Sequence, residues 1–366
     1  MDSSNHSYNT IQTPIIGNPS SFYLTQLSIG SKQYSPYLQV DTGASLTWVQ
    51  CEGCKTCFPL KGGNFKYKES QTNYYLPCNH KLCVPKLCGW VLSDFFAFST
   101  KNLASKVTFR LAFGCGLVNP KMNWGITGTS NVIAGIFGLE RGTRSFLDQL
   151  QSETKMRFSY CLPSSSIDKG AQTLLHFGVD AEIKGSASTK LQTTKLVMSN
   201  KYYVTMLGIS IEGKRLKIDP SVFRLKKNAP NGGGFMIDSG STYSILIKSA
   251  YTIFRNEMVQ YLKQKNGWIP KPQRDIKFSG FDLCYATPKG KNYSLPSVTY
   301  HFGGGADFVM NSYAVFRPLY SILCLGIIGF DGASILGAFQ QVNHRFLFDV
   351  GLSTVSFVPE SPCKYN

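Results

Sequence analysis

The sequence predicts a mainly β protein built from two similar halves, because two short patterns each occur twice. The first is a strand-like run that ends in Asp, a small hydroxyl residue and Gly, at Asp41 and again at Asp238. The second is a glycine beside apolar residues: Gly138 follows Asp41 by 97 residues, and Gly337 follows Asp238 by 99. One Asp-Thr-Gly alone is weak evidence, since Asp and Gly suit any turn. Two patterns repeated in step indicate two related lobes.

The elements along the chain fit this organisation. Alternating and apolar runs predict strands at 23–29, 37–40, 107–115, 158–162 and 202–211. Ser145 is a helix start signal. Residues 249–264 predict a helix with Tyr251, Phe254, Met258 and Tyr261 on one face, which is the pattern of core packing.

The domain organisation follows from composition. Residues 1–20 are polar and carry two prolines, so we expect a flexible lead-in. The Ser-, Gly- and Lys-rich residues 164–190 are the expected boundary between the lobes. This places an N-terminal lobe at 21–175, with a cysteine-rich insert at 51–88, and a C-terminal lobe at 190–366.

Composition and charge restrict the classes of function. With 366 residues and 43% hydrophobic residues, the chain can bury a large core. Its net charge is +17, but the Lys and Arg residues are scattered and no nucleic-acid-binding motif surrounds them, so no nucleic-acid partner is expected. No apolar run is long enough to span a membrane. Residues 1–10 do not resemble a signal peptide.

The cysteines indicate an oxidising compartment. There are 11, and their loop-rich pattern fits disulfides. The spacing Cys51-x-x-Cys54-x-x-Cys57 also suits half of a zinc site, but no second His or Cys group at ligand spacing completes it. We therefore expect no metal.

Two lobes that each present one Asp on a tight turn can bring two carboxylates together. Like charges held close cannot both ionise, so the pair would share a proton. The ionised member can then take a proton from water while the protonated member donates to an amide carbonyl. The glycines after each Asp allow the sharp turn, and the hydroxyl residues can hydrogen-bond across the lobes. These supporting residues are Thr42, Gly43, Ser239 and Gly240.

Other hydrolytic chemistries fit less well. The five histidines fall in no serine- or cysteine-protease sequence context, and no HExxH motif is present. Glycosidases also use paired carboxylates, but not two Asp-hydroxyl-Gly repeats in matching halves.

The two Asp turns and the two apolar-Gly segments resemble the pepsin-like aspartic proteases, and the cysteine-rich stretch resembles the plant nepenthesin-like branch. The resemblance covers about residues 22–363. It implies a bilobal, all-β, pepsin-like fold, an endopeptidase activity of Asp41 and Asp238 on polypeptides, no cofactor, and a monomer that is secreted or vacuolar. It further implies that the substrate cleft contains Trp48, Ser241 and Thr242.

The resemblance also implies disulfide pairs. These are Cys51–Cys54, Cys57–Cys115, Cys83–Cys88, Cys161–Cys363 and Cys284–Cys324. Cys78 is left over.

The chain departs from the family at the flap, the hairpin whose Tyr closes over substrate. The family writes it as Tyr-Gly-Asp-Gly-Ser, and nothing here resembles that run. Residues 88–98 pass directly to the strand expected after the flap. A deletion would explain both the missing flap and an unpaired Cys78, whose family partner lies in that segment. Trp48, which would hydrogen-bond the flap Tyr, loses its partner. A catalytically impaired protease-like binding or inhibitor protein is therefore the alternative function.

A second departure is Ala44, where the family usually has Ser or Thr directly after Asp-Thr-Gly. Loss of a hydrogen bond to the ionised Asp41 should raise the pKa of that carboxyl. We therefore expect an activity optimum less acidic than is usual for pepsin-like enzymes.

Overall fold

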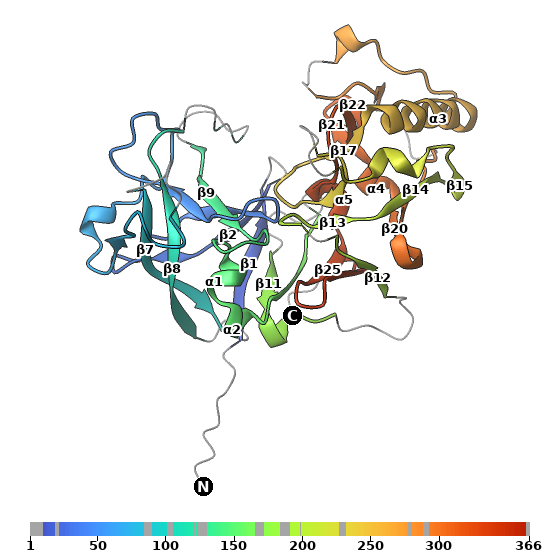
Figure 1. Ribbon diagram of the computed structural model, residues 1–366. Coiled ribbons are helices and arrows are strands. Elements are labelled where there is room, and N and C mark those ends of the chain that lie inside the picture. The colour runs from blue at the N-terminus through green and yellow to red at the C-terminus, as the bar shows by residue number, and fades with distance from the viewer. Residues whose placement is uncertain are drawn as a thin grey trace. The chain divides into compact units, whose positions relative to one another are not determined.

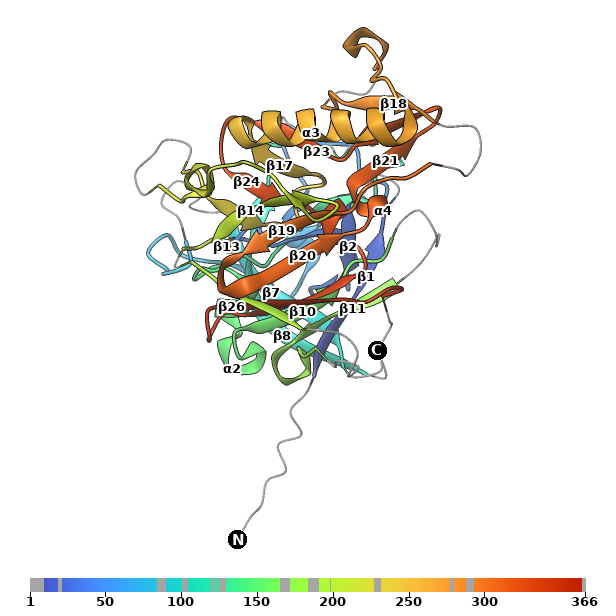
Figure 2. The same ribbon diagram turned by 90° about the vertical axis from the view of Figure 1, so that its right-hand side faces the viewer.

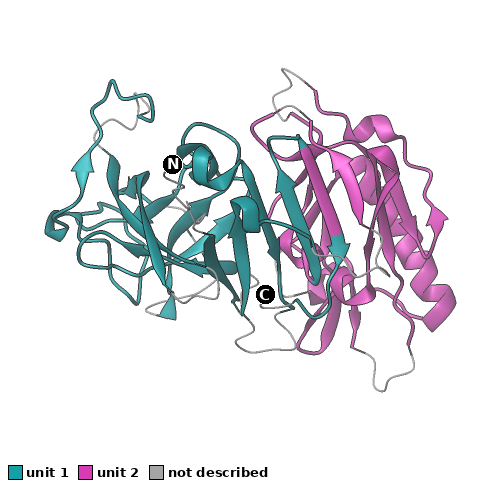
Figure 3. Ribbon diagram, turned by 90° about the horizontal axis from the view of Figure 1, so that it is seen from below, with its two compact units in different colours: residues 1–189, 343–353, 358–366 teal, residues 190–342, 354–357 magenta. Residues whose placement is uncertain are grey.

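The computed structural model describes residues 10–18, 22–83, 90–100, 105–119, 122, 124, 130–164, 172–183, 191–197, 199–226, 232–276, 280–287 and 293–363. Its chain divides into two compact units (Figure 3). Unit 1 comprises 1–189, 343–353 and 358–366, and unit 2 comprises 190–342 and 354–357. Both consist mainly of strands, as the sequence predicts (Figure 1). In the described part of the chain, no helix has the length and apolar character needed to cross a membrane.

Unit 1 is a strand assembly with two short helices, α1 (Phe146–Gln149) and α2 (Gln151–Thr154). Its strands are β1 (Ile11–Gly17), β2 (Tyr23–Gln26), β3 (Ser28–Ile29), β4 (Tyr37–Asp41), β5 (Trp48–Gln50), β6 (Tyr74–Tyr75), β7 (Val91–Ser99), β8 (Lys106–Gly116), β9 (Ile133–Gly138), β10 (Arg157–Cys161), β11 (Gln172–Phe177) and β25 (His344–Asp349). The strands β1, β2, β4, β9, β5, β8 and β7 pair in that order, and β7 pairs again with β1. This ring is a closed barrel, and the same sheet continues beyond it from β1 through β11 and β10 to β25, and from β7 to β3.

The barrel of unit 1 is filled by aromatic side chains. Phe146 lies at the centre of this core, with ring centroids 4.6 Å from Phe177, 4.9 Å from Phe98 and 5.2 Å from Phe137. All four side chains are buried. Ser145, the predicted start signal, caps α1 by accepting a hydrogen bond from the Asp148 N–H at 3.2 Å. The cap turns the chain so that Phe146 enters the core.

Unit 2 contains several smaller sheets. One has the order β13-β16-β24-β17-β23, a second the order β15-β14-β19-β20, and a third the order β18-β22-β21. Its strands are β12 (Gln192–Lys195), β13 (Tyr203–Val204), β14 (Met206–Ile211), β15 (Lys214–Arg215), β16 (Phe235–Ile237), β17 (Ser244–Ile247), β18 (Cys284–Ala286), β19 (Val298–Phe302), β20 (Ala306–Met310), β21 (Phe316–Leu319), β22 (Ile322–Leu325), β23 (Ile327–Phe330), β24 (Ser334–Leu336) and β26 (Thr354–Pro359), of which β26 continues into unit 1.

The long helix of unit 2 is the one that the sequence predicts. It is α3 (Lys248–Asn266), and it lies along β17 and β23 (Figure 2). Tyr251, Phe254 and Met258 of the predicted face are buried. Gly267 ends the helix in the left-handed conformation at φ 68°. Two further short helices are α4 (Ser312–Val315) and α5 (Ala338–Gln341).

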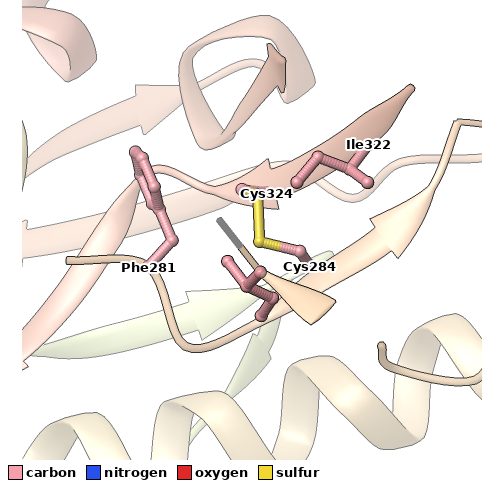
Figure 4. Close-up of a cluster of buried hydrophobic side chains, with 5 residues drawn as sticks. Phe281, Cys284, Ile322 and Cys324 are labelled. Atoms are coloured by element: carbon pink, nitrogen blue, oxygen red, sulfur yellow. A yellow bond between two sulfur atoms is a disulfide. The ribbon is translucent and has the colours of Figure 1, made fainter. Parts of the chain in front are cut away.

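A satellite core of unit 2 forms around a disulfide. Cys284 on β18 and Cys324 on β22 are register partners, and their Cα atoms lie 4.0 Å apart. Phe281 and Ile322 pack against the bridge (Figure 4). This disulfide is one of the predicted pairs.

The predicted flexible lead-in is wrong for residues 11–17, which form the buried strand β1. Ile11 and Ile15 are at most 1% exposed, and β1 pairs with β11 over six register positions from Ile11 to Ile16. The buried Thr13 hydroxyl lies 2.5 Å from the Thr25 hydroxyl. The hydroxyl of Thr13, a polar residue of the expected lead-in, therefore has a hydrogen-bond partner in the buried strand. The rest of that lead-in lies mostly outside the described residues.

The predicted C-terminal lobe also needs a correction, because residues 343–353 and 358–366 belong to unit 1. The strand β25 pairs with β10 from Arg157↔Asp349 to Cys161↔Arg345. The predicted disulfide Cys161–Cys363 is present and joins the same segments. The end of the chain therefore returns to the first unit.

Candidate active site

The first Asp ends a buried strand of the barrel. Asp41 is the last residue of β4 and lies opposite Gly138 on the parallel strand β9. The Leu139 N–H donates to the Asp41 backbone carbonyl at 2.9 Å. The Gly43 N–H donates to Asp41 Oδ1 at 2.7 Å. A backbone donor two residues further on thus fixes the carboxylate, as in an Asx turn.

The second Asp has the same local geometry in unit 2. Asp238 follows β16, whose parallel neighbour is β24, and its N–H donates to the Leu336 carbonyl at 3.1 Å. The Gly240 N–H donates to Asp238 Oδ1 at 2.8 Å. Asp238 is 7% exposed. The two repeats seen in the sequence are therefore two copies of one turn.

The glycines of the two apolar-Gly segments, Gly138 and Gly337, lie in close contact with the backbone that follows each Asp turn. A Cβ atom on Gly138 would lie 2.7 Å from the Ala44 carbonyl oxygen, and one on Gly337 would lie 2.4 Å from the Tyr243 carbonyl carbon. Both neighbours are backbone atoms, which cannot move aside cheaply. Only glycine fits at either position, which explains why a glycine occurs at the matching place in both halves of the sequence.

Two residues that sequence reasoning missed hold these contacts. Thr47 Oγ1 accepts a hydrogen bond from the Gly138 N–H at 3.2 Å, and Ser244 Oγ accepts one from the Gly337 N–H at 2.9 Å. Thr47 and Ser244 occupy the same position relative to their Asp. The two halves align in sequence at these positions, so the sequence pairs Thr47 with Ser244, but it does not indicate their hydrogen bonds to the glycines.

The two turns differ at the residue after Asp-Thr/Ser-Gly. Ser241 was expected in the substrate cleft, and the structure gives its hydroxyl a more specific contact: Ser241 Oγ donates to Asp238 Oδ2 at 2.8 Å. The matching residue in unit 1 is Ala44, which has no hydroxyl to donate. Asp238 therefore has a side-chain donor that residue 44 cannot supply to Asp41.

The other expected site residues lie close to the turns in sequence and in structure. Thr42 and Ser239 are buried, at 1% and 2% exposed. The Thr242 carbonyl accepts a hydrogen bond from the Phe339 N–H at 2.9 Å. That Asp41 and Asp238 meet across the lobes, with Thr42 and Ser239 bracing them, stays a prediction.

Trp48 begins β5 and pairs with both β8 and β9. Its ring packs edge-on against Phe58 at 6.5 Å, in a cluster that also contains Trp124. Trp48 therefore belongs to an apolar cluster of unit 1. The strand expected after the flap is present as β7, which pairs with β8 along its whole length. Residues 84–89, where the flap would begin, lie outside the described residues.

The structure corrects the disulfide pairing of the insert. The pairs are Cys51–Cys115 and Cys54–Cys57, not the predicted Cys51–Cys54 and Cys57–Cys115. Cys51 follows β5 and is buried beside β8, which carries Cys115, whereas Cys57 is exposed. The equal Cys-x-x-Cys spacings gave no local reason to choose between the pairings. Cys51, Cys54 and Cys57 are all in disulfides, so they do not form half of a zinc site.

Cys78 is disulfide-bonded, so the prediction that it is left over was wrong. A deletion of the flap is therefore not needed to explain an unpaired Cys78. The pairing was carried over by resemblance in a segment whose family spacing this chain does not keep. The predicted Cys83–Cys88 pair involves Cys88, which lies outside the described residues.

A mainly β chain of two units, each with an Asp-hydroxyl-Gly turn held against a close-packed glycine, defines the class of pepsin-like aspartic proteases. Aspartic proteinase nepenthesin-1 of Nepenthes gracilis is 31% identical over 354 residues, which span 92% of this chain and 77% of that protein. The chain therefore belongs to the nepenthesin-like family of plant pepsin-like aspartic proteases.

Other relatives in this fold carry different names. Family models described as Xylanase inhibitor N-terminal and Xylanase inhibitor C-terminal match residues 23–89 with 86–178 and residues 201–359. The crystal structure of edgp superposes with a TM-score of 0.74 at 18% identity, covering 95% of this chain and 94% of that one. Basic 7S globulin from soybean gives a TM-score of 0.72 at 20% identity, covering 96% and 95%. These likenesses show the pepsin-like fold.

Proposed function

We propose that this chain is an aspartic endopeptidase in which Asp41 and Asp238 jointly activate water. The observation that carries the proposal is the matched anchoring of the two carboxylates, by Gly43 N–H at 2.7 Å and Gly240 N–H at 2.8 Å. Both Asp residues, both hydroxyl residues and both glycines are present in intact turns. Homologues named as aspartic proteinases support the same activity.

The chemistry would need only these carboxylates and water. With one proton shared by the pair, the ionised carboxylate takes a proton from water as it attacks the amide carbonyl. The protonated carboxyl donates to the carbonyl oxygen. The tetrahedral intermediate then collapses, the C–N bond breaks, and the amine leaves with a proton. We propose extended polypeptides with apolar residues beside the cut as substrates, and no metal or organic cofactor.

The proposed location follows from the disulfides. The described bridges Cys51–Cys115, Cys54–Cys57, Cys161–Cys363 and Cys284–Cys324 are typical of an oxidising compartment. We propose that the protein is secreted or vacuolar and acts as a monomer.

The second candidate is a protease-like protein that binds its partner without cutting it. The missing Tyr-Gly-Asp-Gly-Ser run favours it, because a flap excludes water and contacts the peptide. The match to the Xylanase inhibitor N-terminal model also breaks into two stretches that meet at residues 86–89, where the flap is lacking. Both family models that match this chain are described as parts of a xylanase inhibitor, which supports the binding alternative.

Cleavage of unfolded globin between about pH 3 and pH 6 tests the proposal. The refolded chain should cut it, and both pepstatin and Asp41→Asn should abolish cleavage while the variant keeps its folded circular-dichroism spectrum. A folded, monodisperse wild-type sample that leaves globin intact would contradict the endopeptidase proposal. Insertion of a family flap at residue 89 would then distinguish the two candidate functions. Restored cleavage would identify the flap as the missing part, and a continued lack of cleavage would favour the binding protein.

A further inference from the structure

One face of the sheet formed by β15, β14, β19 and β20 carries a second set of chemically reactive side chains. Ser210 on β14, His301 on β19 and Asp307 on β20 come from three adjacent antiparallel strands, which run side by side in Figure 2. His301 and Asp307 are direct register partners, and Gly208, two residues before Ser210, is the partner of His301. Residues at these positions share one face of a sheet.

The three side chains form a continuous hydrogen-bonded chain. Ser210 Oγ lies 2.8 Å from His301 Nε2, and His301 Nδ1 lies 2.7 Å from Asp307 Oδ1. An ionised carboxylate only accepts, so in the neutral imidazole Nδ1 carries the hydrogen and Nε2 accepts from the Ser210 hydroxyl. This is the order of nucleophile, base and orienting carboxylate that defines a serine triad by geometry and not by sequence position.

A β-bulge brings a cation to the same place. The register between β14 and β19 shifts between Met206 and Gly208, and the Leu207 carbonyl accepts a hydrogen bond from the Arg215 guanidinium. A Cβ atom on Gly208 would lie 2.6 Å from Arg215 Nη2, so a larger residue there would displace the guanidinium from its present position. Arg215 is the register partner of Ser210. The bulge and the glycine thus hold a planar set of N–H donors beside the serine.

The burial gradient limits what could react. Ser210 is 3% exposed, whereas the His301 and Asp307 side chains are 21% and 51% exposed. Arg215 is exposed, but its guanidinium is held by the Leu207 carbonyl. Only a small acyl, phosphoryl or sulfonyl group would reach the Ser210 hydroxyl.

We propose that Ser210, His301, Asp307 and Arg215 form a second nucleophilic site, which hydrolyses esters of small carboxylic acids. His301 Nε2 takes the Ser210 hydroxyl proton as Oγ bonds to the ester carbonyl carbon, and the Arg215 guanidinium stabilises the oxyanion. The ester C–O bond then breaks, and the alcohol leaves with the proton from His301. Water attacks the acyl-serine, gives a proton to His301 and releases the carboxylic acid, which restores the Ser210 hydroxyl.

This site is independent of the two Asp turns. All four residues lie in unit 2, and the hydrogen bonds that link them do not involve Asp238 or the residues that support it. The proposed esterase site can therefore be correct even if the peptidase proposal is wrong, and the peptidase proposal does not depend on the esterase site.

Methanesulfonyl fluoride tests the nucleophile directly, because it is small enough to approach the buried hydroxyl and a reactive serine bonds to its sulfur and expels fluoride. With the full folded chain at neutral pH, peptide mass spectrometry should find the methanesulfonyl group on Ser210. His301→Gln and the exposed-site variant Asp307→Asn should each slow labelling by about 100-fold. Hydrolysis of p-nitrophenyl acetate should fall in parallel and should be unaffected by pepstatin.

Ser356 is the matched internal control. It is 8% exposed in unit 2, and its hydroxyl lies 2.8 Å from the Thr193 hydroxyl with no histidine partner, so it should stay unlabelled. The proposal is overturned if Ser210 is unmodified in folded wild-type protein. It is equally overturned if Ser210 is labelled at the same rate in His301→Gln and Asp307→Asn, since the serine would then react without the hydrogen-bonded chain. Thermal unfolding of both variants shows that the comparison is between folded proteins.

Discussion

The Ser241 hydroxyl donates a hydrogen bond to Asp238 Oδ2 at 2.8 Å, on the oxygen that the turn backbone leaves available. The Gly240 N–H occupies the other oxygen of the same carboxylate. In the first turn the residue that corresponds to Ser241 is Ala44, so residue 44 supplies no such donor, although the backbone N–H of Gly43 contacts Asp41 as that of Gly240 contacts Asp238. The two halves of the proposed dyad are therefore chemically unequal in their own surroundings.

Ala44→Ser should move the pH–activity profile to lower pH. A hydroxyl that donates to the ionised carboxylate favours the ionised form and so lowers the pKa of Asp41. A hydrogen bond to a charged group contributes about 1.5 kcal/mol, which corresponds to roughly one pH unit. The rate of globin cleavage against pH measures this shift. Ser241→Ala is the matched control and should move the profile in the opposite direction, and coincident profiles for wild type and Ala44→Ser would contradict the explanation.

Gly138→Ala should destabilise the protein by roughly 2–3 kcal/mol. The new Cβ would lie 2.7 Å from the Ala44 carbonyl oxygen and 2.8 Å from that of Ser45, so β9 would have to move away from the turn. Urea unfolding followed by fluorescence measures the loss. Gly62→Ala is the control, because its Cβ meets nothing within 4 Å, and it should change stability by no more than about 0.5 kcal/mol. Equal stabilities of the two variants would show that the close approach at Gly138 relaxes freely.

The features that could be predicted from sequence are those set by local patterns or by internal repetition. The Asp turns and their glycine partners repeat within the chain, and α3 shows a helical apolar face and ends at Gly267. The strand β1 was missed because Pro14 and its polar neighbours resemble a loop, and its burial depends on β11, far away in the sequence.

Contacts between distant segments set the limit of sequence reasoning. Nothing near Cys51 indicates that β8 will bring Cys115 to it. Nothing in the sequence near His301 indicates that Ser210 and Asp307 will lie on either side of its ring. The local sequence around each histidine resembles no serine- or cysteine-protease motif. Such partners are decided by strand order and register, which short motifs do not record.

Glu360→Gln should lower the unfolding free energy, because Glu360 helps to hold the C-terminal segment in unit 1. Arg345 Nε lies 2.6 Å from Glu360 Oε2 and Arg345 Nη2 lies 2.8 Å from Oε1, a bidentate pair with side chains only 8% and 17% exposed. Removing the carboxylate leaves a buried guanidinium without its counter-charge, at a cost of about 3 kcal/mol in unfolding free energy. Urea unfolding checks this. The exposed pair Lys66–Glu69, at 63% and 53%, is the control, and Glu69→Gln should change little. Similar small losses in both variants would show that the Arg345–Glu360 pair is not stabilising.

With the corrected pairing, the two disulfides of the cysteine-rich insert should contribute very unequally to the stability of the protein. In the chain-entropy view, a cross-link stabilises by restricting the unfolded chain, and the effect grows with the closed loop. Cys51–Cys115 spans a sequence separation of 64, and Cys54–Cys57 spans only 3. The double variant Cys51→Ala with Cys115→Ala should lose about 4 kcal/mol, and Cys54→Ser with Cys57→Ser should lose about 1.5 kcal/mol or less.

Unfolding in urea under non-reducing conditions distinguishes these losses, and peptide mapping of the wild type identifies the pairs themselves. A peptide containing Cys115 should be joined to one containing Cys51, with the other two cysteines in a small closed loop. If the pairing were instead Cys51–Cys54 and Cys57–Cys115, each double variant would remove one member of both bridges, and the two stability losses would be similar. The size of the difference between the variants therefore tests the connectivity independently of the mapping, because it depends on which cysteine closes the long loop to β8.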